Sequence, residues 1–308
     1  MFTKSLVVIA SAGMLSAAVA QSGGINWQRD VNAALAEARR TQRPLMFYVV
    51  GPTSDRPDAE KDQRVAFRDP TVVRLSQRFV ACRLQRSQHR PDLERWQISP
   101  NANLDIVFVT PGGDRIDMIS AGASGNADSF SQKMHLVFDR HRNDLFAREL
   151  QPRLDDPDTS VANLRTAIGV IDEFIIARAD QALVRLLDRR GLNTQVRWDI
   201  SRTRAPLSTP AAVNALFARA ATDTAAAQAL ERCTPAAADV LLPHVGGEDA
   251  ARHLLAYKAL TSICRISGAK PDRFWEGPNE RVKTDEIERV RTQATRAAER
   301  WKRENRYR

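Results

Sequence analysis

Short apolar runs alternate with segments of helical periodicity along the first part of the chain. A predicted helix over residues 30–40 places Val31, Leu35 and Ala38 on one face. The apolar runs that follow are rich in β-branched and aromatic residues, which favour buried strands: residues 45–50, 79–84 and 105–109. Helical segments separate the runs, so the pattern predicts a β-α-β unit.

A hairpin and a closing helix complete the predicted first domain. The turn-forming sequence TPGG at 110–113 is followed by a further strand-like run at 115–119. Residues 130–141 have the periodicity of a helix. Because helices on a sheet of this kind bury its faces, we expect an α/β sandwich over residues 21–150.

The second half of the chain is rich in Ala, Leu and Arg and has few strand formers after Ser160. This composition is typical of a helical domain. The sequence predicts helices over residues 161–179, 181–189, 210–221, 224–232, 236–242, 249–264 and 284–304. A polar stretch at 151–158 marks the expected boundary, which assigns residues 151–308 to the all-α domain.

The last predicted helix carries an apolar stripe with charged flanks. The stripe consists of Ile287, Val290, Ala294, Ala297 and Trp301 at helical spacing. A stripe of this kind ordinarily packs on the preceding helices. Residues 281–308 contain ten Lys and Arg against five Asp and Glu, an excess that is typical of a solvated face and that can also contact an acidic partner.

Turn sequences in the helical half resemble those of HEAT-like repeats. The resemblance is carried by Thr234-Pro235 and residues 243–249, which resemble interhelix turns, and by residues 250–252 and 256–260, which resemble their second helix. It implies stacked pairs of antiparallel helices. The internal period is poor, and a plain helical bundle fits the same pattern.

The first twenty residues have the pattern of a secretory signal peptide. Lys4 precedes an apolar stretch of 15 residues, 6–20, in which Ala18 and Ala20 provide the small residues of a cleavage site. A membrane-spanning helix needs about 20 apolar residues. We therefore expect cleavage near Ala20 and export to the periplasm or the exterior.

The charge of the chain indicates which partners suit it. The 308 residues carry a formal net charge of +9, which becomes +8 when a leader containing Lys4 is removed. This balance favours acidic partners or anionic surfaces. Nucleic-acid binding is not expected, because the sequence lacks a reader motif and interleaved aromatic and basic residues. No later segment reaches membrane-spanning length, so no membrane span is expected.

Several landmarks of the first domain follow the order and spacing of secreted thioredoxin-like domains. They are Trp27 before the first predicted helix, RPLMF at 43–47, FRDPTV at 67–72, FV at 79–80 and FVTPGG at 108–113. The segment from residue 25 to about residue 144 therefore resembles that family. The resemblance implies a thioredoxin fold, a Cys-x-x-Cys pair that exchanges disulfides, and a cis-proline that faces the pair.

This chain departs from the family at both of those features. The positions assigned to the redox pair hold Arg56 and Ala59, neither of which can form the thiolate that attacks a disulfide. The position of the cis-proline falls on Leu104, and Pro100 lies four residues earlier. Cis peptide bonds are rare outside X-Pro. The departures imply a scaffold without redox activity, and we expect no catalytic residue.

The three cysteines offer other chemistry. Cys82 lies in a predicted apolar strand, where a small buried residue is the ordinary interpretation. Cys233 and Cys264 lie 31 residues apart on predicted helices, and in an oxidising compartment a disulfide between them would join neighbouring helices. The five histidines are scattered without metal-ligand spacing. Neither a metal site nor a cofactor is expected.

These patterns favour an exported, non-catalytic interaction or scaffold protein with an unidentified and acidic protein partner. Two other functions remain open. One is an atypical thiol-disulfide enzyme that uses Cys82 or the pair Cys233 and Cys264 in an unfamiliar way. The other is a binder of an acidic envelope surface, which the positive charge favours.

Overall fold

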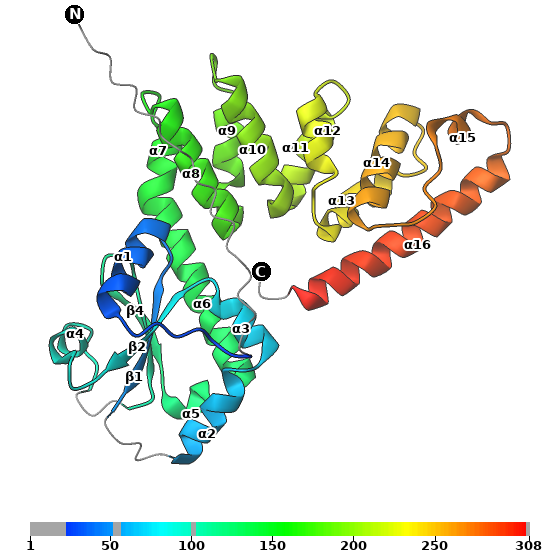
Figure 1. Cartoon of the computed structure of the whole chain (residues 1–308). Helices are drawn as coiled ribbons and strands as arrows, with labels where there is room; N and C mark the ends of the chain where they lie inside the picture. Colours follow the sequence, from blue (N-terminus) through cyan, green and yellow to red (C-terminus); the bar gives the residue numbers. More distant parts are fainter. Residues whose placement is uncertain (1–22, 52–56, 100–102, 306–308) are drawn as a thin grey trace, which may run out of the picture. The chain divides into compact units, whose positions relative to one another are not determined.

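The computed structural model of the chain describes residues 23–51, 57–99 and 103–305. It divides into two compact units, Met1–Met134 and His135–Arg308 (Figure 1). The first unit is a mixed α/β structure and the second is largely helical, which confirms the predicted order of fold classes at that level. The predicted signal peptide lies outside the described residues.

The first unit is built on a four-stranded sheet with the order β2-β1-β3-β4. The strands are β1 (Leu45–Val50), β2 (Val80–Gln85), β3 (Ile106–Val109) and β4 (Arg115–Ile119). β1 runs parallel to β2, with Leu45 opposite Val80, and β3 is antiparallel to both β1 and β4. The predicted β-α-β unit and hairpin are therefore confirmed.

Side-chain caps define where helices of this unit begin. The helices are α1 (Val31–Thr41), α2 (Pro57–Ala66), α3 (Pro70–Ser76), α4 (Arg90–Arg95), α5 (Ala121–Ser124) and α6 (Ala127–Leu145). Asp30 Oδ1 accepts a hydrogen bond from Ala33 N at 3.0 Å at the start of α1. Asp69 Oδ1 accepts one from Thr71 N at 2.8 Å at the start of α3. Each cap satisfies a backbone N–H that has no partner within its helix.

Helices cover both faces of the sheet, with α1 and α4 on one side and α3 and α6 on the other (Figure 1). On the first face the ring of Phe47 stacks on Trp96, with 5.1 Å between centroids. The next residue, Tyr48, contacts the rings of Trp27 and Phe67, each at 5.4 Å. Because side chains alternate along a strand, a sheet covered on both faces requires an apolar run such as that of β1.

The boundary between the compact units lies within α6, between Met134 and His135, and differs from the predicted boundary at 151–158. The chain stays helical after α6, through a π-helical turn at Phe146–Leu150 and then α7 (Gln151–Asp155). Residues 151–155 of the predicted boundary stretch are therefore helical, and Asp156, Pro157 and Asp158 lie in the turn before the helix that begins at Val161.

The second unit consists of consecutive helices, and those from Thr194 to Glu304 share one apolar core. The helices after α7 are α8 (Val161–Phe174), α9 (Asp180–Leu187), α10 (Thr194–Leu207), α11 (Pro210–Arg219), α12 (Thr224–Leu230), α13 (Ala238–Leu241), α14 (Ala250–Ile263), α15 (Asp272–Glu276) and α16 (Glu280–Glu304). Short 3₁₀ turns lie at Ala177–Ala179, Pro235–Ala237 and Leu242–His244. Fully buried core residues include Leu230, Leu241, Leu260 and Val290. The prediction of a helical second half is confirmed.

Helix α16 follows the predicted apolar stripe only in part. Val290 and Ala294 are buried as predicted, and the next buried residue is Ala298, where Ala297 was expected. Glu286 is also buried, and it accepts a hydrogen bond from the hydroxyl of Tyr257 at 2.6 Å. The buried face is therefore rotated slightly and includes a paired polar residue that hydrophobic periodicity does not reveal.

Helix α10 has no counterpart among the predicted helices. It contains Pro206 and buries Arg204, of which only 1% is exposed. Arg204 Nε donates to Asp180 Oδ1 at 2.6 Å, and Asp180 Oδ2 accepts from Thr209 Oγ1 at 3.0 Å. A core position occupied by a charged pair is invisible to a search for hydrophobic periodicity.

Removing the guanidinium of this pair should destabilise the protein. We expect Arg204→Ala to lower the free energy of unfolding by about 3–5 kcal/mol, because Asp180 would remain buried without its counter-ion. Arg219→Ala is the control, since Arg219 pairs with Asp188 at 3.2 Å on the surface and such pairs contribute about 0–1 kcal/mol. Chemical denaturation measures both changes, and equal losses would contradict the argument.

Candidate functional site

A network of buried polar side chains lies where the resemblance places a redox site. Gln63, on α2, is fully buried. Its Nε2 donates to Leu104 O and to Ser124 Oγ, both at 2.6 Å. Its Oε1 accepts a hydrogen bond from the Tyr48 hydroxyl at 3.1 Å. One amide side chain thus connects β1, α2, α5 and the segment that precedes β3.

The segment before β3 has an uncommon backbone conformation at Leu104. The φ of Leu104 is +65°, in the left-handed region that costs a residue with a side chain roughly 1–2 kcal/mol. Its N donates to Val49 O at 2.8 Å, while the neighbouring Asn103 accepts from Gly51 N at 2.9 Å. These bonds and the bond from Gln63 hold the strained residue. The peptide bonds of the described residues are all trans.

The two positions that the resemblance assigns to a redox pair hold Arg56 and Ala59. Arg56 lies outside the described residues. Ala59 is half-buried in the first turn of α2. It precedes Gln63 by four residues, so the two share one face of the helix. Because Gln63 reaches Leu104, the structure brings this face of α2 beside Leu104.

Tyr48 supplies the titratable hydroxyl of this network. Burial, followed by the negative charge of Glu60, raises the pKa of Tyr48 to about 12. The hydroxyl therefore stays protonated at neutral pH and donates to Gln63. A protonated phenol and an amide are weak nucleophiles and weak bases. The described part of the site is suited to holding the fold together, and it lacks the groups that redox exchange requires.

The cysteines are buried or partly buried thiols with raised pKa values. Burial raises the pKa of Cys82, on β2, to about 11. Burial also raises the pKa of Cys233 to about 12 and that of Cys264 to about 11. The thiolate is the reactive form of cysteine, and these values leave almost none of it at neutral pH.

Cys233 and Cys264 lie in neighbouring segments of the helical unit. Both belong to its apolar core or pack against it. Ser262 Oγ donates to Glu231 O at 3.4 Å, and each of these residues lies two positions before one of the cysteines. Both cysteines are free thiols in the structure. The disulfide between them stays a prediction.

Sequence reasoning missed Gln63 and Tyr48 as members of the site. Gln63 lies between Asp62 and Arg64 on a helix that is polar along most of its length. Nothing in that pattern separates it from its solvent-exposed neighbours. Only the tertiary structure brings position 63 within hydrogen-bonding distance of Tyr48 and Leu104.

Two other classes of feature, metal-binding clusters and membrane-spanning helices, are not found among the described residues. Its His, Cys, Asp and Glu side chains form no group of three that could hold a metal ion. Among the same residues, none of the helices is both long and apolar enough to cross a membrane. Comparisons with protein-family models, curated proteins and solved structures give no match to this chain. Its function is therefore argued from its own residues.

Truncating the central amide tests the network. We expect Gln63→Ala to lower the free energy of unfolding by about 1–3 kcal/mol, because the Leu104 carbonyl and the Tyr48 hydroxyl would be left buried without this partner. Gln132→Ala removes an exposed amide from α6 and should change stability by at most about 0.5 kcal/mol. Thermal or chemical unfolding of both variants gives the comparison, and identical stabilities would show that the network is dispensable.

Thiol labelling tests the burial of the cysteines. At pH 8 we expect the folded protein to react with a disulfide reagent about 100-fold more slowly than free cysteine, because the pKa values are raised. In denaturant, three thiols should react if Cys233 and Cys264 are free, and one if they are joined. Rapid labelling of the folded protein would contradict the assignment of inert thiols.

Proposed function

We propose that this chain is an exported, non-catalytic interaction protein. In this proposal it combines a redox-inactive thioredoxin-like domain with an α-helical, HEAT-like domain. The signal-peptide pattern of residues 1–20 supports export. In the periplasm or outside the cell, the protein would serve as a scaffold that binds another protein.

The topology of the first unit supports the thioredoxin-like assignment. A parallel β-α-β unit is followed by an antiparallel hairpin, and helices cover both faces of the sheet. This arrangement agrees with the order of the landmarks at 43–47, 67–72 and 108–113. In the helical unit, the side-by-side packing of consecutive helices supports a HEAT-like arrangement in the same way.

The raised pKa values of the three thiols are the observation that supports the proposal that the protein is not a redox enzyme. Family chemistry needs an exposed thiolate of low pKa at a helix N-terminus and a second thiol one turn later. Burial instead raises the pKa of each cysteine to about 11 or 12. Cys82 also belongs to a different compact unit from Cys233 and Cys264. The alternative of an atypical thiol enzyme is therefore weakly supported.

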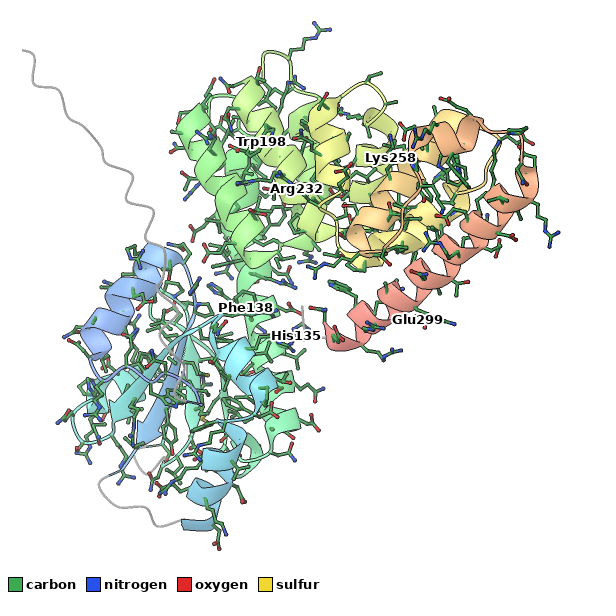
Figure 2. The ribbon with its side chains drawn as sticks, turned by 45° about the vertical axis from the view of Figure 1, so that its right-hand side comes forward. His135, Phe138, Trp198, Arg232, Lys258 and Glu299 are labelled. Atoms are coloured by element: carbon green, nitrogen blue, oxygen red, sulfur yellow. The ribbon has the colours of Figure 1, made fainter. Side chains whose placement is uncertain are left out.

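An exposed aromatic residue on the helical unit supports an interaction role. Trp198, on α10, is 37% exposed (Figure 2). The guanidinium of Arg202 lies over its ring, 5.2 Å from the centroid. Tryptophan and arginine are the residue types that most often contribute binding energy at protein interfaces. We propose that Trp198 is part of the contact surface.

Capture with the full-length protein tests the proposal. We expect the wild-type chain to retain a specific protein from an envelope fraction, and Trp198→Ala to lower its recovery about 10-fold or more. Val161→Ala is the control, because it shortens another exposed apolar side chain, on α8. Equal recovery by all three proteins would remove Trp198 from the contact surface.

An insulin-reduction assay on the same protein tests the absence of thiol catalysis. The rate should equal that of the uncatalysed reaction, because the thiols are protonated at neutral pH. Turnover that disappears in Cys82→Ser would refute the non-catalytic assignment.

A further inference from the structure

The helical unit contains a pocket near its C-terminal end. It has a volume of about 500 Å³ and lies among the turn at Gly246, the start of α14, α15 and the first turns of α16. Figure 1 shows α15 beside the start of α16. The turn is held close to α16, since a side chain at Gly246 would come within 3.3 Å of Ile287. Gly246 has a φ of +82°, which glycine adopts without strain.

A buried histidine lines this pocket with one ring nitrogen unpartnered. His253 is 8% exposed, and its Nδ1 accepts a hydrogen bond from Gly246 N at 2.8 Å. A backbone N–H can only donate, so the proton of the neutral ring is on Nε2. Burial lowers the pKa of His253, which favours this neutral form. Among the described residues, Nε2 has no hydrogen-bond partner.

Trp275 supplies a second buried donor in the same pocket. Its Nε1 also lacks a partner among the described residues. The ring of Trp275 contacts that of His253 edge to face, with 4.4 Å between centroids, and contacts that of Tyr257 at 4.8 Å. Tyr257 is fixed in turn by its hydrogen bond to Glu286. Two neighbouring N–H groups on this aromatic wall thus lack an acceptor, which is unfavourable for buried donors.

The rim of the pocket is acidic. Its carboxylates are Glu248, Asp272, Glu276 and Glu280, and its one lysine is Lys283. Asp272 and Glu280 pair with lysines at 2.8 Å. Among the described residues, Glu248 and Glu276 form no ion pair and are exposed. The pocket therefore has the opposite charge to the chain as a whole, which carries +9.

We propose that this pocket binds a basic segment of a peptide, with a backbone carbonyl oxygen at the N–H groups of His253 and Trp275. The lysine or arginine side chain of the segment then lies at Glu248 and Glu276. A carbonyl oxygen has two lone pairs and can accept from both donors. A cation favours the carboxylates and the faces of aromatic rings. This inference rests on the proposed interaction function and gives the chemistry of one partner segment.

Two small probes test the two halves of the proposal on the full-length protein. N-acetyl-L-argininamide has carbonyl oxygens and a guanidinium, whereas N-acetyl-L-citrullinamide has the same shape without the charge. We expect saturable changes in the tryptophan indole NMR signals, with a Kd of order 1 mM for the arginine probe. The citrulline probe should bind about 3-fold or more weakly, and salt should weaken only the arginine probe.

Variants assign the binding to the pocket. Glu276→Gln should weaken the arginine probe about 2- to 5-fold and leave the citrulline probe unchanged. Glu299→Gln, on α16 outside the pocket, removes the same charge and should have no effect. Trp275→Phe keeps an aromatic ring and removes the N–H, so it should weaken both probes about 5-fold.

Several outcomes would overturn this inference. One is the absence of saturable binding by the wild type up to about 20 mM probe. Another is equal affinity for the probes in Glu276→Gln and Glu299→Gln. A Trp275→Phe variant that folds and binds like the wild type would show that the indole N–H contacts a neighbouring ring and no ligand. These failures leave the capture experiment on Trp198 unaffected, so the pocket and the general interaction function are tested separately.

Discussion

The cost of burying a polar group without a partner is the constraint on which both units of this chain depend. In the α/β unit, the amide of Gln63 satisfies this constraint by bonding Tyr48, Leu104 and Ser124. In the helical unit, Arg204 does so by pairing with Asp180. Each arrangement joins segments that are distant in the sequence. Leaving a buried donor or charge unpaired costs free energy, so each of these two arrangements holds its neighbouring segments in one geometry.

The same constraint separates structural polar groups from a candidate ligand site. The partners of Gln63 and Arg204 come from the chain itself, so these residues need nothing from outside. His253 and Trp275 each bury an N–H without an acceptor among the described residues. They line a pocket with an acidic rim. The net charge of the chain and the local charge of this pocket therefore favour different ligands, since a Coulomb interaction at contact depends on the nearest groups.

The proposed absence of redox chemistry rests on where the sulfur atoms lie. A reactive cysteine needs exposure and a nearby positive charge to lower its pKa. Here burial raises the pKa of each thiol. Where the resemblance expects a redox pair, the described part of the site is occupied by the Gln63 network and by Leu104 in a left-handed conformation.

The sequence by itself determined the strands, most of the helices and the change from an α/β to a helical unit. Each of these has an apolar period that repeats over neighbouring residues, as in β1 at Leu45–Val50. It also showed that position 59, which the resemblance assigns to a redox cysteine, holds an alanine that cannot supply a thiol. Only the tertiary structure decided that Gln63 is buried, that Arg204 lies in a core and that His253 shares a pocket with Trp275. These properties depend on partners 15 to 61 residues away, and local periodicity contains no information about such contacts.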